Sequence, residues 1–358
     1  MKILYVITGL GQGGAERVVC DLADAMVQKG HQVRIVYFVG EVLTRPTCEG
    51  IELMKVSLTN IISLPAAYIL LSKIIKSYQP DVVHSHMVHA NILTRLVKIV
   101  TPINRLISTA HSSNEGGALR MLAYRLTNRL ADVSTNVSNT AVASFESRYA
   151  VPKKGMKAIY NGVNFDDFSY STQAKIAIKD ELGLDQNCKV ILAVGRFNKA
   201  KNYLNLLRSI RFLKTANSIP FVLIIAGDGE LRSEIERHII ELELDKEVIL
   251  LGRRSDISTL MSACDTFVLS SDYEGLPTVL IEALACQANV VSTDVSGARE
   301  ILDGYGSIVP IQKPEALAKA IEANLLIEQK NILGRQYAKD KFDIKIISDE
   351  WVEIYHEK

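Results

Sequence analysis

Two carboxylates and two cations stand just beyond short apolar runs of the sequence. Glu274 and Glu282 are separated by seven residues, while Arg196 and Lys201 follow the apolar run Val190–Val194. A planar guanidinium and a point-charge ammonium together suit the two phosphates of a diphosphate. Two solvated loop cations are the alternative interpretation of the same residues. The spacing therefore favours a phosphate-bearing ligand without settling it.

The segment that carries the two glutamates is predicted to be a loop followed by a helix. Pro277 suits the first turn of that helix, and the backbone N–H groups from Gly275 to Thr278 can bind phosphate or sugar oxygens. Glu282 falls near the second turn, between the apolar residues Ile281 and Ala283. A carboxylate there is costly without partners, and a ribose diol supplies two donors. An ordinary helical glutamate paired with a lysine or arginine is the alternative.

A glycine-rich loop, Gly9–Gly14, follows the first apolar run and includes Gly13 and Gly14. Its G-x-G-x-x-G spacing is also that of dinucleotide-binding folds, and glycines let backbone N–H groups approach a ligand at a helix N-terminus. A nicotinamide site also requires an acid at the end of the second strand. That strand is predicted to end at Val39, and the nearest acid is Glu41. A glycine-rich loop facing an interdomain cleft is therefore favoured over a dehydrogenase site.

Histidines also lie at predicted strand ends. His111 follows the run Leu106–Ala110, where a lone histidine is more often structural than catalytic. His84 and His86 would share one face of a strand, a spacing that suits a metal ion. No cluster of cysteines or carboxylates accompanies them, and the sequence has no Asp-x-Asp motif. A metal site is therefore not expected.

These residues are held by alternating β-branched runs and helical patterns, which predict an α/β fold with two doubly wound domains. The boundary is expected near Asn161–Phe168, which gives an N-terminal domain 1–164, a second domain 165–340 and a closing helix 341–358. That helix contains Trp351 and could pack back on the first domain. Ligands of open α/β sheets bind at the carboxyl ends of strands, so two such domains are expected to face a cleft. The strands are predicted at Lys2–Thr8, Gln32–Phe38, Asp81–His84, Leu106–Ala110, Val133–Val137, Val190–Val194, Phe221–Ala226, Val248–Leu251, Thr266–Leu269 and Asn289–Ser292. The helices are predicted at Ala15–Lys29, Ser63–Tyr78, Asn91–Val100, Ala118–Ala131, Tyr203–Lys214, Leu231–Glu241, Ile257–Ala263 and Thr278–Cys286.

Composition agrees with a globular chain of this organisation. Of 358 residues, 48% are hydrophobic and 23% charged, and five scattered cysteines suggest core residues of a reducing compartment. No apolar stretch is long enough to span a bilayer, and the N-terminus lacks signal-peptide features, so a cytoplasmic protein is expected. Residues 1–160 hold 18 basic and 10 acidic groups, whereas the rest hold 23 basic and 30 acidic ones. A basic first half suits an anionic partner, although solvated faces explain it as well; dispersed charges and few aromatics disfavour nucleic acid.

The predicted helix Ala118–Ala131 is basic and amphipathic. Arg120, Arg125 and Arg129 lie among leucines, with no acid before Asp132. Such a surface fits an anionic lipid or a lipid-diphosphate acceptor. A core-packing helix with snorkelling arginines is the alternative.

Taken together, the chain resembles retaining glycosyltransferases of the GT-B fold, family 4 (glycosyl transferases group 1), of the bacterial surface-polysaccharide type. The Glu274–Glu282 pair matches the E-x7-E signature of that class. Four further segments, in the family's order along nearly the whole chain, share the resemblance: Gly13-Gly14-Ala15-Glu16, Asn161-Gly162-Val163 with Phe168, Gly195-Arg196 with Lys201, and Gly227-Asp228-Gly229-Glu230.

The resemblance implies a role for each matching residue. Arg196 and Lys201 would hold the donor diphosphate, Glu282 the ribose, and Glu274 a hydroxyl of the transferred sugar. His111 matches a family histidine beside the donor sugar that supports transfer. The remaining donor-binding residues would be Gly13, Gly14, Arg253, Gly275, Leu276, Pro277 and Thr278. Two positions depart from the family: Asn202, where many members have glycine, and Leu276, where phenylalanine is also common.

The implied activity is metal-independent transfer from a nucleoside-diphosphate sugar, with a UDP-sugar favoured, to a glycan or lipid-linked acceptor with retention. Lipopolysaccharide, O-antigen or capsule synthesis is the implied setting, with no cofactor and with contact to the inner face of the cytoplasmic membrane as an open option. A nucleotide-sugar epimerase of the same fold is the first alternative, and a NAD-dependent oxidoreductase is the second.

Overall fold

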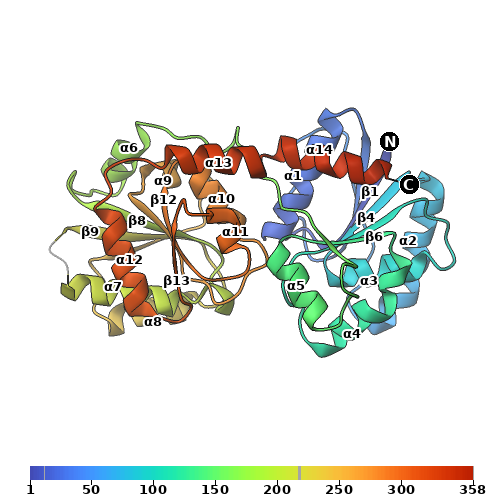
Figure 1. The fold of residues 1–358 in the computed structure, drawn as a ribbon, viewed down its shortest axis with the longest axis horizontal. Coiled ribbons are helices and arrows are strands. Elements are labelled where there is room, and N and C mark those ends of the chain that lie inside the picture. The colour runs from blue at the N-terminus through green and yellow to red at the C-terminus, as the bar shows by residue number, and fades with distance from the viewer. Residues whose placement is uncertain (12, 217–218, 358) are drawn as a thin grey trace. The chain divides into compact units, whose positions relative to one another are not determined.

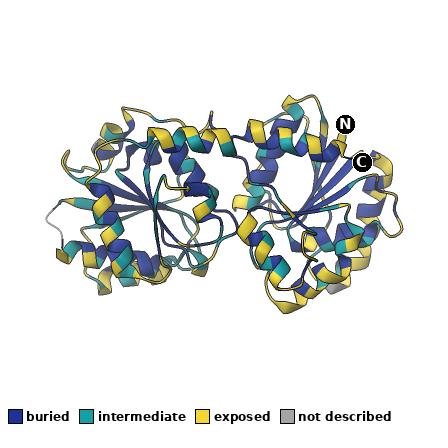
Figure 2. Cartoon of the chain, viewed as in Figure 1, coloured by how far each residue is buried: buried dark blue, intermediate teal, exposed yellow. Residues whose placement is uncertain are grey.

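The computed structural model describes residues 1–11, 13–216 and 219–357. The chain forms two compact units, one of Met1–Val163 with Phe342–Lys358 and the other of Asn164–Lys341. Each unit holds one parallel β-sheet with helices packed on it (Figure 1). The strands of both sheets are largely buried, and exposed residues lie mainly on the outer faces of helices and in loops (Figure 2).

The first unit contains a seven-stranded sheet in the order β3-β2-β1-β4-β5-β6-β7. Its strands are β1 (Lys2–Gly9), β2 (Gln32–Val39), β3 (Glu52–Lys55), β4 (Val82–His86), β5 (Leu106–Ala110), β6 (Val133–Asn136) and β7 (Lys157–Ala158). Its helices are α1 (Gly14–Gln28), α2 (Leu64–Tyr78), α3 (Val88–Val97), α4 (Ala118–Thr127), α5 (Asn139–Ser147) and α14 (Ile344–His356).

Alternation along β1 explains why both faces of this sheet are covered. Tyr5 belongs to a core with residues of α1 and α14, whereas Val6 belongs to a second core with residues of α2 and α3. Successive side chains of a strand point to opposite faces, so a strand that is apolar throughout requires helices on both sides. Trp351 of α14 lies in the first of these cores. Helix α14 runs beside α1 (Figure 1).

The second unit contains a six-stranded sheet in the order β10-β9-β8-β11-β12-β13. Its strands are β8 (Lys189–Val194), β9 (Phe221–Ala226), β10 (Val248–Gly252), β11 (Thr266–Leu269), β12 (Asn289–Thr293) and β13 (Ser307–Val309). Its helices are α6 (Ala174–Glu181), α7 (Tyr203–Ala216), α8 (Arg232–Glu241), α9 (Ile257–Ala263), α10 (Thr278–Ala285), α11 (Ala298–Leu302) and α12 (Pro314–Leu325), and α13 (Ile332–Phe342) runs up to the division between the units.

The doubly wound α/β fold expected from the sequence is confirmed for both units, whereas several element boundaries were wrong. The outer strands β3, β7 and β13, which have four, two and three residues, were not predicted. Helix α3 begins at Val88 rather than Asn91. Helix α4 ends at Thr127, whose hydroxyl donates to the Ala123 carbonyl (2.7 Å), and a 3-10 turn follows. Within the described residues, no helix has the length and apolar character that crossing a membrane requires.

Candidate functional site

In the second unit, the strand order reverses between β8 and β11. The chain runs outward from β8 to β9 and β10 on one side, and from β11 to β12 and β13 on the other. Loops leaving such a point diverge, and they open a crevice at the carboxyl ends of the strands where ligands of these sheets bind. Lys201 lies in the loop region after β8, and Glu274 lies in the loop after β11.

Lys201 and Glu274 form an ion pair across this point. The Lys201 Nζ lies 2.8 Å from the Glu274 Oε1, and the two side chains are only 19% and 17% exposed. The Ser271 hydroxyl donates to the same carboxylate oxygen (2.8 Å). A charge pair this enclosed is screened less by solvent than a surface pair, so its electrostatic interactions are stronger. The structure therefore brings together two of the residues singled out in the sequence.

The backbone around Lys201 is shaped by two asparagines. The Asn198 side chain accepts a hydrogen bond from the Lys201 N–H (3.2 Å) and caps a short 3-10 turn, Lys199–Lys201. Asn202 adopts a left-handed conformation with φ 40° and ψ 58°. Glycine and asparagine are the residues that tolerate this region best, which explains how Asn202 can stand where many members of the family that the sequence resembles have glycine. Its amide also donates to Asp272 (2.8 Å) and so ties the two loops together.

Close backbone packing requires glycine at two positions of this site. A Cβ atom at Gly227, after β9, would lie 2.0 Å from the Gly195 carbonyl oxygen. At Gly297, where φ is +78°, a Cβ atom would lie 2.8 Å from the Leu276 Cδ1. Any larger residue at either position would displace the loops that carry Lys201 and Glu274.

The segment that leads into α10 is enclosed. Gly275, Leu276 and Pro277 are buried, and Thr278 is half-buried at the first position of the helix. The Ser296 hydroxyl donates to the Gly275 carbonyl (3.2 Å). Glu282 is half-buried in the second turn of α10. The helix begins at Thr278, as the sequence predicted, although Pro277 is its N-cap and not part of its first turn.

The two arginines predicted for this site lie in other surroundings. Arg196 is 61% exposed, and its guanidinium pairs with Glu230 at 3.2 Å. Arg253 is also exposed, with its Nε 3.8 Å from the Asp228 Oδ2. Both residues follow the carboxyl ends of strands. Their ion pairs with Glu230 and Asp228 do not include Lys201 or Glu274.

The strand order of the first unit reverses between β1 and β4. Gly13 is the N-cap of α1 and Gly14 its first residue, just beyond β1. Gln12 of the same loop lies outside the described residues. His86 is the last residue of β4, and His111 follows β5. The glycine loop and these histidines therefore share the carboxyl edge of the first sheet, the edge at which open α/β sheets generally bind ligands.

The buried histidines of this unit bind one another and nearby hydroxyls. The His86 Nδ1 and the His111 Nε2 are 3.0 Å apart. The His84 Nδ1 lies 2.8 Å from the Tyr355 hydroxyl, and its Nε2 lies 2.7 Å from the Thr109 hydroxyl. The Nδ1 of His84 thus holds α14 and its Nε2 holds the neighbouring strand β5, which accounts for this residue without a metal ion. Among the described residues, no group of three or more histidines, cysteines or carboxylates is arranged to hold a metal.

Burial keeps these histidines uncharged. It lowers the pKa of His111 to about 4 and the pKa values of His84 and His86 well below their usual range. Desolvation disfavours the imidazolium form, so all three rings are neutral at neutral pH. Each ring therefore carries one N–H donor and one nitrogen acceptor.

Helix α4 presents an unusually apolar outer face. Leu119 and Leu126 are 84% and 74% exposed, and Leu122 is also exposed, whereas Met121 and Tyr124 face the core. Arg125 and Arg129 are exposed near these leucines in the sequence. Arg120 instead donates to the Glu115 carbonyl (3.1 Å) and thereby holds the loop after β5. Leu119 and Arg120 also line an apolar groove of about 270 Å³ between α2, α3 and α4.

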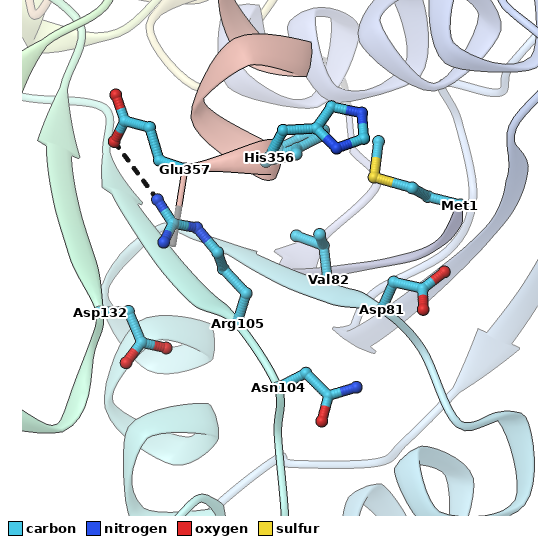
Figure 3. A pocket seen from close by; sticks show the side chains of 9 residues that line it. Met1, Asp81, Val82, Asn104, Arg105, Asp132, His356 and Glu357 are labelled. Atoms are coloured by element: carbon cyan, nitrogen blue, oxygen red, sulfur yellow. Dashed lines mark hydrogen bonds and ion pairs between the residues drawn. The ribbon is translucent and has the colours of Figure 1, made fainter.

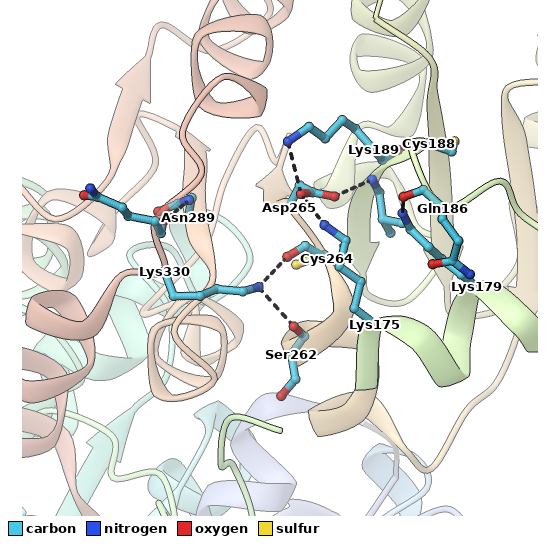
Figure 4. A network of polar contacts seen from close by, with 12 residues as sticks. Lys175, Lys179, Gln186, Cys188, Lys189, Ser262, Cys264, Asp265, Asn289 and Lys330 are labelled. Carbon is cyan, nitrogen blue, oxygen red and sulfur yellow. Dashed lines mark hydrogen bonds and ion pairs between the residues drawn. The ribbon is translucent and has the colours of Figure 1, made fainter. Parts of the chain in front are cut away.

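Two other polar features lie at the opposite, amino-terminal edges of the sheets. A cavity of about 800 Å³ is lined by Asp81, Arg105 and Glu357 among others (Figure 3). In the second unit, Lys175 pairs with Asp265 at 2.7 Å, and Lys330 donates to two backbone carbonyls (Figure 4). The Asp265 carboxylate also accepts from the Val190 N–H (2.9 Å) and so joins two strand starts. This network is structural.

Sequence reasoning missed three residues of these sites. The first is Ser271, whose hydroxyl donates to the Glu274 carboxylate. The second is Tyr203, whose hydroxyl donates to the Gly195 carbonyl (2.9 Å). Burial raises the pKa of the Tyr203 hydroxyl, and the negative charge of Glu274 raises this pKa further. Glu115 accepts from the His111 N–H (2.9 Å). Only Glu115 carried a usable signal, as an acid four residues after the candidate histidine.

Comparisons with known proteins agree with this architecture. Residues 12–167 match the family model described as Glycosyltransferase Family 4, and residues 174–340 match that of Glycosyl transferases group 1. Anabaena HepE, solved in complex with UDP-glucose, superposes with a TM-score of 0.85 over 99% of both chains at 20% identity. The fold is that of the GT-B glycosyltransferases. Within this class, the chain belongs to glycosyltransferase family 4, the glycosyl transferases group 1.

Two relatives come from Campylobacter jejuni. One is N-acetylgalactosamine-N,N'-diacetylbacillosaminyl-diphospho-undecaprenol 4-alpha-N-acetylgalactosaminyltransferase, 28% identical over 341 residues that cover 90% of each chain. The other is GalNAc-alpha-(1->4)-GalNAc-alpha-(1->3)-diNAcBac-PP-undecaprenol alpha-1,4-N-acetyl-D-galactosaminyltransferase. It is 29% identical over an alignment of 374 positions, which covers 100% of this chain and 99% of the relative.

Proposed function

We propose that this glycosyltransferase moves a sugar from a nucleoside-diphosphate donor, a UDP-sugar in the first instance, to a lipid-diphosphate-linked glycan of a bacterial surface polysaccharide. The enclosed Lys201–Glu274 pair at the β8/β11 switch point is the observation that carries this proposal. The names of the two Campylobacter relatives support the acceptor class, and the HepE complex supports the UDP-sugar.

In the proposed donor complex, Lys201 binds the diphosphate while Glu274 accepts a hydrogen bond from a hydroxyl of the transferred sugar. The N-terminus of α10, from Gly275 to Thr278, adds backbone dipoles on the same side, and Glu282 binds the ribose. Arg196 joins the diphosphate by leaving Glu230, and Arg253 contacts the nucleobase. Gly13, Gly14 and His111 of the first unit also contact the donor in this proposal.

The reaction we propose proceeds with retention and without a metal ion or another cofactor. The bond between the anomeric carbon and the leaving diphosphate breaks, and the acceptor oxygen forms its bond to that carbon on the same face. The acceptor proton passes to an oxygen of the departing diphosphate. Catalysis is then mainly stabilisation of the charge that grows on the diphosphate, by Lys201, Arg196 and the α10 N-terminus. No carboxylate acts as a covalent nucleophile in this mechanism.

A thermal-shift series followed by a transfer assay tests this function. The protein is melted with UDP-, GDP- and ADP-sugars, because a ligand that binds only the folded state stabilises it by about 2.7 kcal/mol at 100 times its Kd. We expect the largest shift with a UDP-sugar, and transfer only when a diphospho-undecaprenol-linked saccharide is added. Conversion of the donor without any acceptor would instead support an epimerase, and an absorbance change of NADH would support an oxidoreductase.

The outer face of α4 is proposed to bring the enzyme to the inner face of the cytoplasmic membrane, where its acceptor is anchored. The three exposed leucines enter the interface while Arg125 and Arg129 meet anionic headgroups. We expect co-sedimentation with vesicles that contain anionic lipid, and weaker binding to purely zwitterionic vesicles.

Two double variants separate the contributions to this membrane binding. Leu122→Asn with Leu126→Asn should abolish sedimentation with either vesicle, whereas Arg125→Gln with Arg129→Gln should remove only the preference for anionic lipid. Ile240→Asn, at an exposed position of α8, is the matched control. If both double variants sedimented with the vesicles as the parent does, this membrane surface would be refuted.

A further inference from the structure

His86 and His111 form a pair that the proposed mechanism does not yet use. His86 ends β4 and His111 follows β5, and the two strands are adjacent, with His86 opposite Thr109. The rings meet through the His86 Nδ1 and the His111 Nε2 at 3.0 Å. Since both rings are neutral, one nitrogen of this pair carries the shared proton and the other accepts it.

Each of the two possible arrangements leaves one ring N–H group to be satisfied elsewhere. If His111 donates, His86 must carry its own proton on Nε2. If His86 donates, His111 carries its proton on Nδ1. Within the described part of the chain, neither the His86 Nε2 nor the His111 Nδ1 has a hydrogen-bond partner. The arrangement is therefore decided by which of these two nitrogens can better hold an unpaired donor.

The surroundings of the two residues differ. His86 is 1% exposed and packs between the rings of Tyr5 and His84, at centroid distances of 5.6 and 4.0 Å. A donor on its Nε2 would remain unpaired in the core, which is destabilising. The His111 Nδ1 is likewise shielded from solvent, but His111 as a whole is half-buried and follows β5 at the carboxyl edge of the sheet, so of the two residues it is the one that a ligand bound at that edge could contact.

The turn that follows His86 is held under strain. Met87 has φ 71° and ψ 159°, a region that is unfavourable for a residue with a Cβ atom. Glu115 clamps this turn to His111, because it accepts from the Val88 N–H (3.2 Å) and from the His111 N–H (2.9 Å). Strained backbone persists where the surrounding structure over-determines it, as ligand sites commonly do. The clamp sets where the His86 and His111 rings meet.

We propose that His86 is a positioning residue that donates its Nδ1–H to the His111 Nε2 and thereby holds His111 in the tautomer with a proton on Nδ1. His111 then presents a fixed N–H donor to an oxygen of the transferred sugar, a ligand whose identity rests on the proposed function. In this tautomer His111 binds and orients the sugar, and it does not act as a general base through Nδ1. The His84-x-His86 pattern of the sequence is thus explained by one packing histidine and one orienting histidine.

The tautomer is measured directly on the intact protein. Long-range ¹H–¹⁵N correlation spectra of protein labelled with ¹⁵N-histidine distinguish protonated from unprotonated ring nitrogens, and His111→Gln identifies the His111 signals. We expect a protonated Nδ1 and an unprotonated Nε2 for His111. The opposite pattern in the unmodified protein would overturn the inference before any His86 variant is made.

Two variants whose new side chains have nearly the same shape as each other then test the role of His86. His86→Asn still offers a donor near the Nδ1 position, so it should keep the His111 tautomer and most of the turnover. His86→Asp offers only acceptors, so it should move the proton to the His111 Nε2 and lower kcat. The expected loss is on the order of 10- to 100-fold, the range seen when orienting partners of metal-bound imidazoles are removed. An unchanged His111 pattern in His86→Asp would contradict the proposal.

A second buried histidine provides the control. His84→Asn removes contacts to Tyr355 and Thr109 but none of the hydrogen bonds of His111. It should lower the melting temperature while leaving the His111 signals in place. The spectra do not depend on catalysis, so the failure of the proposed function would appear as missing sugar transfer, whereas the failure of this inference would appear as the wrong tautomer.

Discussion

Replacing Lys201 with alanine is expected to lower kcat for sugar transfer about 100-fold or more, the cost of removing one preorganised donor from a developing oxyanion. The Lys201 Nζ is enclosed beside Glu274, so it needs no large desolvation to act on the diphosphate. The effect should fall on kcat more than on the KM of the donor, because charge on the diphosphate grows only as the sugar leaves.

Controls for this prediction lie within the same loop. Lys199→Ala removes an exposed lysine two residues away and should leave kcat close to that of the parent. Arg196→Ala should also lower kcat if Arg196 leaves Glu230 to bind the diphosphate. In that case Glu230→Gln, which frees the guanidinium, should not lower it. Near-normal transfer by Lys201→Ala would refute the assigned role of this lysine.

The second large effect is expected at Glu274. Glu274→Gln keeps the size of the side chain and a carbonyl oxygen for the Ser271 hydroxyl, but it removes the charge that faces Lys201. Hydrogen bonds to charged groups contribute about 1.5–3 kcal/mol, so we expect kcat/KM to fall roughly 10- to 100-fold. Because Glu274 and Lys201 are in contact, the double variant Lys201→Ala with Glu274→Gln should lose less than the sum of the two single losses.

Deoxy donors locate the hydroxyl that Glu274 binds. A UDP-sugar that lacks this hydroxyl should be poor for the parent enzyme, and Glu274→Ala should discriminate against it far less. Glu282→Gln is the contrasting variant, because removing a ribose interaction that is equally strong in the ground state and the transition state raises KM and leaves kcat unchanged. Glu243→Gln, in an exposed pair with Arg211, serves as the surface control. Equal discrimination by parent and Glu274→Ala against every deoxy donor would contradict the assignment.

Much of the fold was predictable because its signals are local. Strands such as β1 and β9 are almost continuous apolar runs, and that pattern requires helices on both faces wherever it occurs. The edge strand β10 was predicted from its own apolar run, whereas the edge strands β3, β7 and β13 escaped prediction. Their pairing depends on the neighbouring strand rather than on their own composition. The end of α4 at Thr127 was also missed, since the predicted helix continued to Ala131.

The candidate site was predictable in its residue types but not in its pairings. Lys201 and Glu274 could be placed at strand ends from the sequence, and the strand order then makes those ends adjacent. Arg196 could be placed equally well, yet it is exposed and paired with Glu230. The pattern of apolar residues predicts which strand a residue follows. The direction in which the side chain of that residue points depends on the conformation of the loop.

The Glu274–Glu282 spacing, the glycine loop and the alternating runs are properties of the sequence alone, and they identified the family and the two doubly wound folds. Tertiary structure decided which groups meet: Lys201 with Glu274, and His86 with His111, the latter through strands that are adjacent in the sheet but separated by 19 residues between β4 and β5. The physical reason is that the energy of a polar group inside a protein depends on its desolvation and its partners. Both are set by segments distant in sequence.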